Sequence, residues 1–338
     1  MRKVFGLISL VLVLSGSLSA QVSYSSAITN LVQVTYNGSS TATVVVASNL
    51  KSYVTASVSG GAVSIVQKST VSASTCGEII YQLKGASTNG AFSLEGNYKA
   101  TIELHGLSLT NPNGPAVNIL NGKRIEIKPI EGTISTLTDG TSTVEDAWKA
   151  ALYCKGHIEF KGKGTLNVYG NYAHAIYCKE YMSIKNCTIN VCSAMKDALH
   201  CREYFLMESG KVSLRGFASD GIECNIDGTT STGETAEHEN EDSGNIYIMG
   251  GSLLIDMSNS SGDSIKPDGK KIISADATVD ITNRMAIENI SQTEQALKVY
   301  NLLGVLVGVY DSPQMLNALP KGTYVIKNSS ITKKISVL

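Results

Sequence analysis

Short runs of alternating apolar and polar residues, broken by glycines, fill most of the chain, and one run recurs about every 23 residues. It is a tetrapeptide of a small residue, an apolar residue, a variable residue and a cysteine. The cysteines, spaced by 24, 23 and 23 residues, are Cys154, Cys178, Cys201 and Cys224. Without cysteine, the same pattern extends to Ala116-Val117-Asn118-Ile119 and Ser264-Ile265-Lys266-Pro267. Internal repetition is therefore the dominant feature of the sequence.

A repeat of this length, rich in β-branched residues and interrupted by glycine, is typical of one coil of a right-handed parallel β-helix. Each coil is expected to carry three short strands, which in one coil cover residues 151–154, 157–161 and 165–169. Alternation with a period of two places Leu152 and Cys154 in the core and Tyr153 outside. Helical periodicity is nearly absent, so the chain is predicted to be all-β.

The repeat does not cover the whole chain. Strands within residues 21–96 are expected to cap the first coil, because an exposed solenoid end would template aggregation. Regular coils are expected over residues 97–285, with insertions at 136–148 and 227–243. From residue 288 to 338 the pattern changes, and its short strands predict a small C-terminal β-sandwich.

The four repeated cysteines share the inward parity of their coils and form a predicted core column. Adjacent coils stack about 4.8 Å apart, but side chains in register point the same way, so their Cβ vectors do not converge as a disulfide requires. We expect unpaired thiols. Disulfide pairing or metal binding by some of them is the alternative, although the spacings match no zinc motif. Cys187 is placed at a corner, and Cys192 faces outward.

The N-terminus has the features of an export signal. Arg2 and Lys3 precede an apolar stretch over residues 4–14 and small residues at 17–20, which predicts a signal peptide of residues 1–20. The apolar stretch is too short to span a bilayer. We expect a secreted or surface-displayed monomer with no membrane span. The net charge of -1 predicts no general attraction to nucleic acid.

Three stretches in the C-terminal region resemble a known sorting domain. They are Val299-Tyr300-Asn301-Leu302-Leu303-Gly304, Leu319-Pro320-Lys321-Gly322-Thr323-Tyr324 and the basic final strand Lys333-Lys334-Ile335-Ser336-Val337-Leu338. As a set they resemble the C-terminal sorting domain of the type IX secretion system. The resemblance implies, for residues 288–338, the type IX secretion machinery as a partner and the outer-membrane surface or the extracellular space as the location. An immunoglobulin-like accessory domain is the alternative.

Several short motifs in the coils carry a second resemblance. They are Gly106-Leu107-Ser108-Leu109-Thr110-Asn111, Gly114-Pro115-Ala116-Val117, Leu137-Thr138-Asp139-Gly140, Gly162-Lys163-Gly164-Thr165-Leu166-Asn167-Val168 and Asp220-Gly221-Ile222. Their order and spacing, over roughly residues 60–281, resemble a family of secreted parallel β-helix carbohydrate-binding proteins related in shape to pectate lyases. The resemblance implies calcium and acidic or cellulosic plant polysaccharides as ligands. The cysteine column departs from the family, as does the scarcity of aspartate in the early coils.

A corner column of carboxylates is the candidate metal site. Asp197, Asp220 and Asp263 each precede the small residue of their coil. Stacked carboxylates repel by about 1 to 4 kcal/mol at a surface dielectric, and calcium, which takes six to eight oxygen ligands, would remove that cost. The acidic insertion would add Asp227 and Asp242. The alternative is that these aspartates only cap their turns.

Two neighbouring outward columns form the candidate ligand-binding face. Tyr153 and Tyr177 offer flat apolar faces with polar tips, which suit sugar rings, and His200 continues their column. The next column is basic and suits uronate carboxylates. Its members are Lys155, Lys179 and Arg202. The alternative is that both columns are ordinary solvated sheet surface.

Together these features predict a secreted protein that binds polysaccharide, either acidic and pectin-like or cellulosic, with calcium assistance. The first alternative is a polysaccharide lyase, in which a cation acidifies the C5 proton of a uronate and a base removes it. Arg202, Lys266 and His200 are the candidate bases, but no motif assigns any of them that role. The second alternative is an adhesin or structural surface protein.

Overall fold

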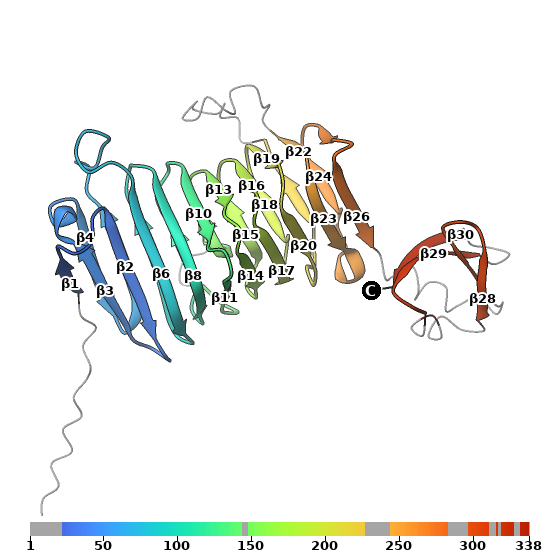
Figure 1. Ribbon diagram of the computed structural model, residues 1–338, viewed down its shortest axis with the longest axis horizontal. Coiled ribbons are helices and arrows are strands. Elements are labelled where there is room, and N and C mark those ends of the chain that lie inside the picture. Colours follow the sequence, from blue (N-terminus) through green and yellow to red (C-terminus); the bar gives the residue numbers. More distant parts are fainter. Residues whose placement is uncertain are drawn as a thin grey trace, which may run out of the picture.

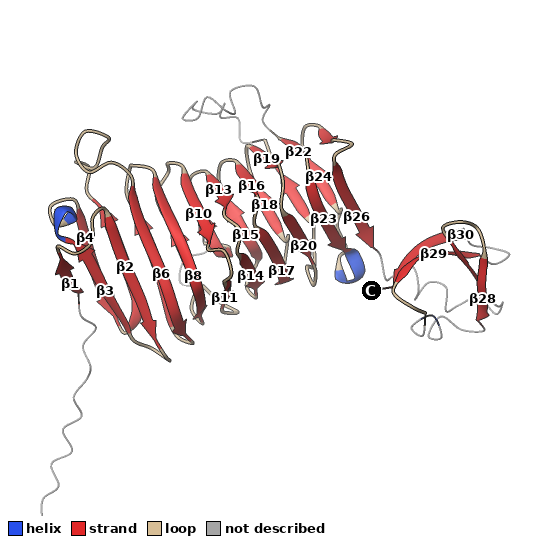
Figure 2. Ribbon diagram, viewed as in Figure 1, coloured by secondary structure: helices blue, strands red, loops and turns tan. Residues whose placement is uncertain are grey.

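The computed structural model describes residues 22–143, 148–226, 244–282, 297–310, 316, 319–327 and 332–337. Strands dominate this part of the chain, with the short 3-10 helices η1 (Ser48–Leu50) and η3 (Met257–Asn259) between them. Figures 1 and 2 show the strands lying side by side in layers along the long axis. The predicted all-β class is confirmed.

Sheet A has 17 strands, most of which form two parallel rows joined through one long strand. The strands of sheet A are β1 (Val22–Ser25), β2 (Leu31–Asn37), β3 (Ala42–Ala47), β6 (Ile79–Ser87), β8 (Ala100–Asn111), β10 (Ile125–Pro129), β11 (Ile134–Asp139), β13 (Ile158–Lys161), β14 (Thr165–Gly170), β16 (Met182–Lys185), β17 (Thr188–Ala194), β19 (Tyr204–Met207), β20 (Lys211–Leu214), β22 (Asn245–Ile248), β23 (Gly251–Asp256), β25 (Lys271–Ile273) and β26 (Ala277–Thr282).

Sheet B has nine strands and forms the remaining wall of the coils. Its strands are β4 (Val54–Ser59), β5 (Gly61–Gln67), β7 (Gly90–Glu95), β9 (Val117–Ile119), β12 (Ala150–Cys154), β15 (His174–Cys178), β18 (Leu199–Cys201), β21 (Ile222–Cys224) and β24 (Ile265–Pro267). A separate sheet C contains β27 (Leu297–Asn301), β28 (Leu306–Tyr310), β29 (Gly322–Lys327) and β30 (Thr332–Val337).

The long strand β8 joins the two rows of sheet A. Its first half pairs with β10 and its second half with β11, and the bend between them falls at Gly106, whose φ of 67° favours glycine. From β8 onward, each row adds one strand per coil in parallel register, and so does sheet B. The predicted parallel β-helix is confirmed.

The repeat in the sequence appears as columns in the core. Leu152 lies opposite Ile176 in register, and Cys154 lies opposite Cys178. All four repeated thiols are buried, and all seven cysteines of the chain, which lie within the described residues, are unpaired. Cys187, at its corner, is also buried, whereas Cys192, predicted to face outward, is half-buried. Burial raises the pKa of Cys154 to about 12, so the thiol stays protonated and unreactive at neutral pH.

Antiparallel pairs stand at the first end of the stack, where β2 pairs with β3 and β4 with β5. Parallel pairing then continues from β6 into β8 and from β7 into β9. The insertion expected at 136–148 is shorter than predicted, because Leu137 belongs to β11 and pairs with Val168 of β14. The insertion at 227–243 and the predicted signal peptide lie outside the described residues.

Sheet C is antiparallel, in the order β28-β27-β29-β30. It has its own apolar cluster, in which Leu297, Val299 and Ile326 are buried. The predicted small C-terminal β unit is therefore present, and its described residues form one four-stranded sheet. Within the described ranges, no helix has the length and apolar character needed to cross a membrane.

Candidate functional site

The predicted aromatic column exists but is covered. The rings of Tyr153 and Tyr177 stack with centroids 5.7 Å apart and planes 4° apart, and His200 stacks on Tyr177 at 4.8 Å. However, Tyr153 is 3% exposed and Tyr177 7% exposed, and both pack in a cluster that includes Leu120 and Trp148. The expectation of open ring faces is wrong, because the outward side of a sheet meets solvent only where no neighbouring segment lies over it.

The predicted basic column is accessible and is part of a larger feature. Lys155, Lys179 and Arg202 lie in the short segments that lead from a sheet B strand to the next strand of sheet A. The segments stack through backbone hydrogen bonds, in which the Lys155 N–H donates to Ile119 and the Lys179 N–H to Cys154. Lys155 is exposed, and the other two are half-buried.

Two earlier segments extend this corner. Residues 96–99 and 120–124 precede β8 and β10, which pair in register, so Lys99, Lys123 and Arg124 continue the basic column. We call the set Lys99, Lys123, Arg124, Lys155, Lys179 and Arg202 the basic corner. The five segments also contain Glu180 and Glu203, so six positive and two negative residues leave a formal charge of +4. This contrasts with the net charge of -1 for the whole chain.

A hollow opens at the first end of the basic corner. Its volume is about 260 Å³, and it is lined by Asn97, Tyr98, Lys99, Lys123 and Arg124. It therefore combines one aromatic ring, one amide and three cationic side chains. Sequence reasoning missed these residues, because the 120–124 segment is longer than its counterparts in the coils that carry the cysteines.

Carboxylates behind the hollow fix the position of Arg124. Its guanidinium lies 2.9 Å from Glu78 and 3.6 Å from Glu159. Burial alone would raise the pKa of Glu159, but hydrogen bonds from Lys161 and Tyr181 outweigh it and lower the pKa. The carboxylate is therefore ionised and holds Arg124 in place.

The aspartates of the predicted metal column connect successive coils. Asp197 Oδ1 accepts the backbone N–H of Asp220 at 3.0 Å, and Asp220 Oδ1 accepts that of Asp263 at 2.6 Å. Asp197 and Asp220 are buried, whereas Asp263 is exposed. Each of the two buried aspartates caps the following coil. Asp227 and Asp242, the other predicted ligands, lie outside the described residues.

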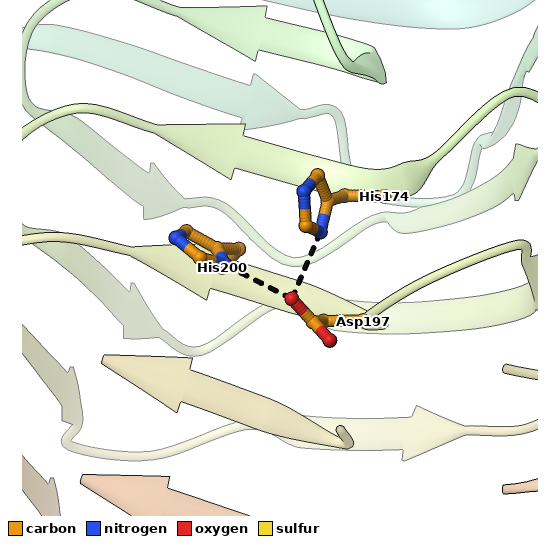
Figure 3. A group of neighbouring side chains, drawn as sticks. All are labelled: His174, Asp197 and His200. Atoms are coloured by element: carbon orange, nitrogen blue, oxygen red, sulfur yellow. Dashed lines mark hydrogen bonds and ion pairs between the residues drawn. The ribbon is translucent and has the colours of Figure 1, made fainter. Parts of the chain in front are cut away.

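The second oxygens of these aspartates face a polar network on the outer side of sheet B. Asp197 Oδ2 lies 3.0 Å from His174 Nδ1 and 2.9 Å from His200 Nδ1. Figure 3 shows both rings beside the Asp197 carboxylate. Glu223 Oε2 lies 3.0 Å from the same nitrogen of His200. Lys266 Nζ completes the network, 3.0 Å from Asp220 and 2.7 Å from Glu223.

Comparison with known proteins assigns the coil region to a family. A family model described as carbohydrate-binding domain-containing protein matches residues 59–301, more than two thirds of the chain. The chain belongs to this family. No curated protein sequence matches it.

Among solved structures, the carbohydrate-binding family member described here is similar to the polysaccharide lyase-like protein from C. thermocellum, studied as a gadolinium derivative. The TM-score is 0.52 at 18% sequence identity, over 74% of this chain and 96% of the other. At that identity the likeness establishes a shared fold and nothing more. The fold that the coil motifs predicted is therefore confirmed.

Proposed function

We propose that this protein binds an acidic polysaccharide along the basic corner. The observation that carries the proposal is the stack of six cationic side chains on five successive corners, with an aromatic-lined hollow at one end. A polyuronate carries one carboxylate on each sugar, and ammonium and guanidinium groups are its natural partners. Membership of a carbohydrate-binding family supports the ligand class.

The geometry suits an extended chain. Coils rise by about 4.8 Å each, so five corners cover roughly 19 Å from the first to the last. A stiff polysaccharide lying along the stack would meet a positive charge on every coil. Tyr98 lines the hollow and provides an aromatic ring for a sugar near one end.

Affinity electrophoresis in gels containing polygalacturonate tests this proposal, with neutral cellulosic glycan as the comparison. We expect retardation by the polyuronate that weakens as added salt shortens the screening length from about 30 to 8 Å. Retention by the neutral glycan alone, with no salt dependence, would favour a cellulose-binding protein. Absence of retention in both gels would favour the structural surface protein.

We also propose that calcium assists binding, and the same gels run with calcium and with chelator test this. The described aspartates fit the ion poorly, because both Oδ1 atoms accept backbone N–H groups and Lys266 already provides a cation at Asp220 Oδ2. Asp263 is exposed and is the described member best placed to bind calcium, whereas Asp227 and Asp242 lie outside the described residues. Calcium-independent retardation would contradict this part of the proposal.

The lyase alternative gains little from the described residues. The hydrogen bonds that Lys266 donates to Glu223 and Asp220 raise its pKa well above the ordinary value, so its amine stays protonated and cannot accept a proton. His200 is buried between Asp197 and Glu223. An increase in ultraviolet absorbance from an unsaturated uronate product would nevertheless establish lyase activity.

We further propose that residues 288–338 direct export through the type IX secretion machinery to the outer-membrane surface or beyond. Sheet C has its own apolar cluster, and the coils bury their core against one another, so deletion of 288–338 is expected to leave the β-helix folded. The truncated protein should accumulate in the periplasm, as measured by fractionation. Surface display of the truncated protein would contradict the proposal.

A further inference from the structure

We propose that His174, Asp197 and His200 form a binding site for a zinc-class divalent transition metal, with Glu223 as a fourth donor. His174 begins β15, Asp197 lies in the corner before β18, His200 is in β18 and Glu223 is in β21. The donors thus come from three successive coils. The site is independent of the basic corner and of polysaccharide binding.

The donor atoms already converge. One potential ligand atom from each of His174, Asp197 and His200 lies within 4.8 Å of the other two, and Figure 3 shows a nitrogen of each ring directed at the carboxylate. Metal–ligand distances of about 2.0 to 2.2 Å with tetrahedral angles separate ligand atoms by roughly 3.3 Å. The observed separations of 2.9 and 3.0 Å from Asp197 Oδ2 need only a few tenths of an ångström of opening.

Nδ1 of His174 has no well-oriented hydrogen-bond partner in the absence of a metal. The side chain of His174 is nearly buried, and its Nδ1 forms no hydrogen bond of good geometry although Asp197 Oδ2 is only 3.0 Å away. A buried polar atom without such a bond is costly, and a metal ion would satisfy it. His200 Nδ1 faces both Asp197 and Glu223, which is more acceptor capacity than one N–H can serve.

Surrounding groups hold the donors in position, as they do around protein metal sites. Asp197 Oδ1 is fixed by the Asp220 N–H, which leaves Oδ2 directed at the two rings. Tyr177 packs against both rings, with centroids 5.4 Å from His174 and 4.8 Å from His200. Lys266 holds the other oxygen of Glu223.

The donor set selects the class of metal. Calcium and magnesium bind oxygen ligands, whereas imidazole nitrogen with carboxylate favours zinc, copper, nickel and cobalt. The buried position and the contribution from three coils indicate a structural ion that ties the coils together.

The test uses the full-length secreted chain, stripped with chelator and then titrated with zinc chloride by calorimetry and elemental analysis. We expect one zinc bound through this site, at least about 100-fold weaker binding after His174→Gln or His200→Gln, and no competition from calcium. His157→Gln is the matched control. His157 is another buried histidine, 3.7 Å from Glu203 in a separate cluster, and its replacement should leave this zinc in place.

Cobalt substitution provides a readout that folding defects in the variants cannot imitate. Wild-type protein should give visible ligand-field bands without a thiolate charge-transfer band. Such a band would assign the metal to the cysteines and overturn the proposal. Failure of the wild type to bind zinc would also overturn it, as would full zinc content in both His174→Gln and His200→Gln.

Discussion

Reversing the charge of Lys155, Lys179 and Arg202 to glutamate should weaken binding to polygalacturonate by roughly 100-fold. Each charge pair near the surface contributes up to about 1 kcal/mol, so losing three removes up to about 3 kcal/mol, which corresponds to about two powers of ten in the dissociation constant. Repulsion between the new carboxylates and the uronates adds to the loss. Isothermal titration calorimetry at low salt measures the change.

The matched control changes the same number of charges elsewhere. Lys84, Lys163 and Lys211 are exposed and lie outside the basic corner. Their replacement by glutamate gives the same net charge and should leave most of the affinity. If both triple variants lose affinity equally, binding follows the overall charge and the basic corner is not the site.

Replacing Asp197 with alanine should destabilise the β-helix by about 3 kcal/mol in buffer that contains chelator. The substitution leaves a buried N–H of Asp220 without its acceptor and two buried histidines without their carboxylate. In a coil region of this size, that loss lowers the melting temperature by about 6 to 12 °C. Urea unfolding and differential scanning calorimetry measure both quantities.

Asp263→Ala is the control, because Asp263 stands in the same column but is exposed. Its replacement should change the free energy of unfolding by no more than about 0.5 kcal/mol. Equal effects of the two substitutions would show that the hydrogen bond and the histidine contacts of Asp197 contribute nothing to stability.

The fold could be predicted because the repeat reflects the alternation of inward and outward residues within each short strand. Inward and outward parity is a property of each short strand, and one coil is enough to place Cys154 inside and Tyr153 outside. Whether an outward residue is exposed depends on segments from elsewhere in the chain. Leu120 and Trp148 pack against the tyrosines, and no periodicity indicates this.

The two candidate sites show the same limit. Lys155, Lys179 and Arg202 follow directly after the repeated cysteines and could be aligned by eye. Lys123 and Arg124 could not be aligned with that column, because Asn121 and Gly122 lengthen the corner segment and shift its register. In the repeat, His174 stands at the position of Asp197 and His200 at the position of Tyr177, and only the structure brings both side chains to the same carboxylate.

The capping aspartates give the stack a polarity. Asp139 accepts an N–H from Asn171 of the next coil, Asp197 one from Asp220, and Asp220 one from Asp263. Asp220 thus offers its carboxylate to the following coil, while its own N–H donates to Asp197 of the coil before it. A duplicate of the Asp220 coil would supply a carboxylate acceptor to the coil after it and a backbone N–H donor to the coil before it. Such a protein can therefore lengthen by whole coils and gain binding surface without changes to its core.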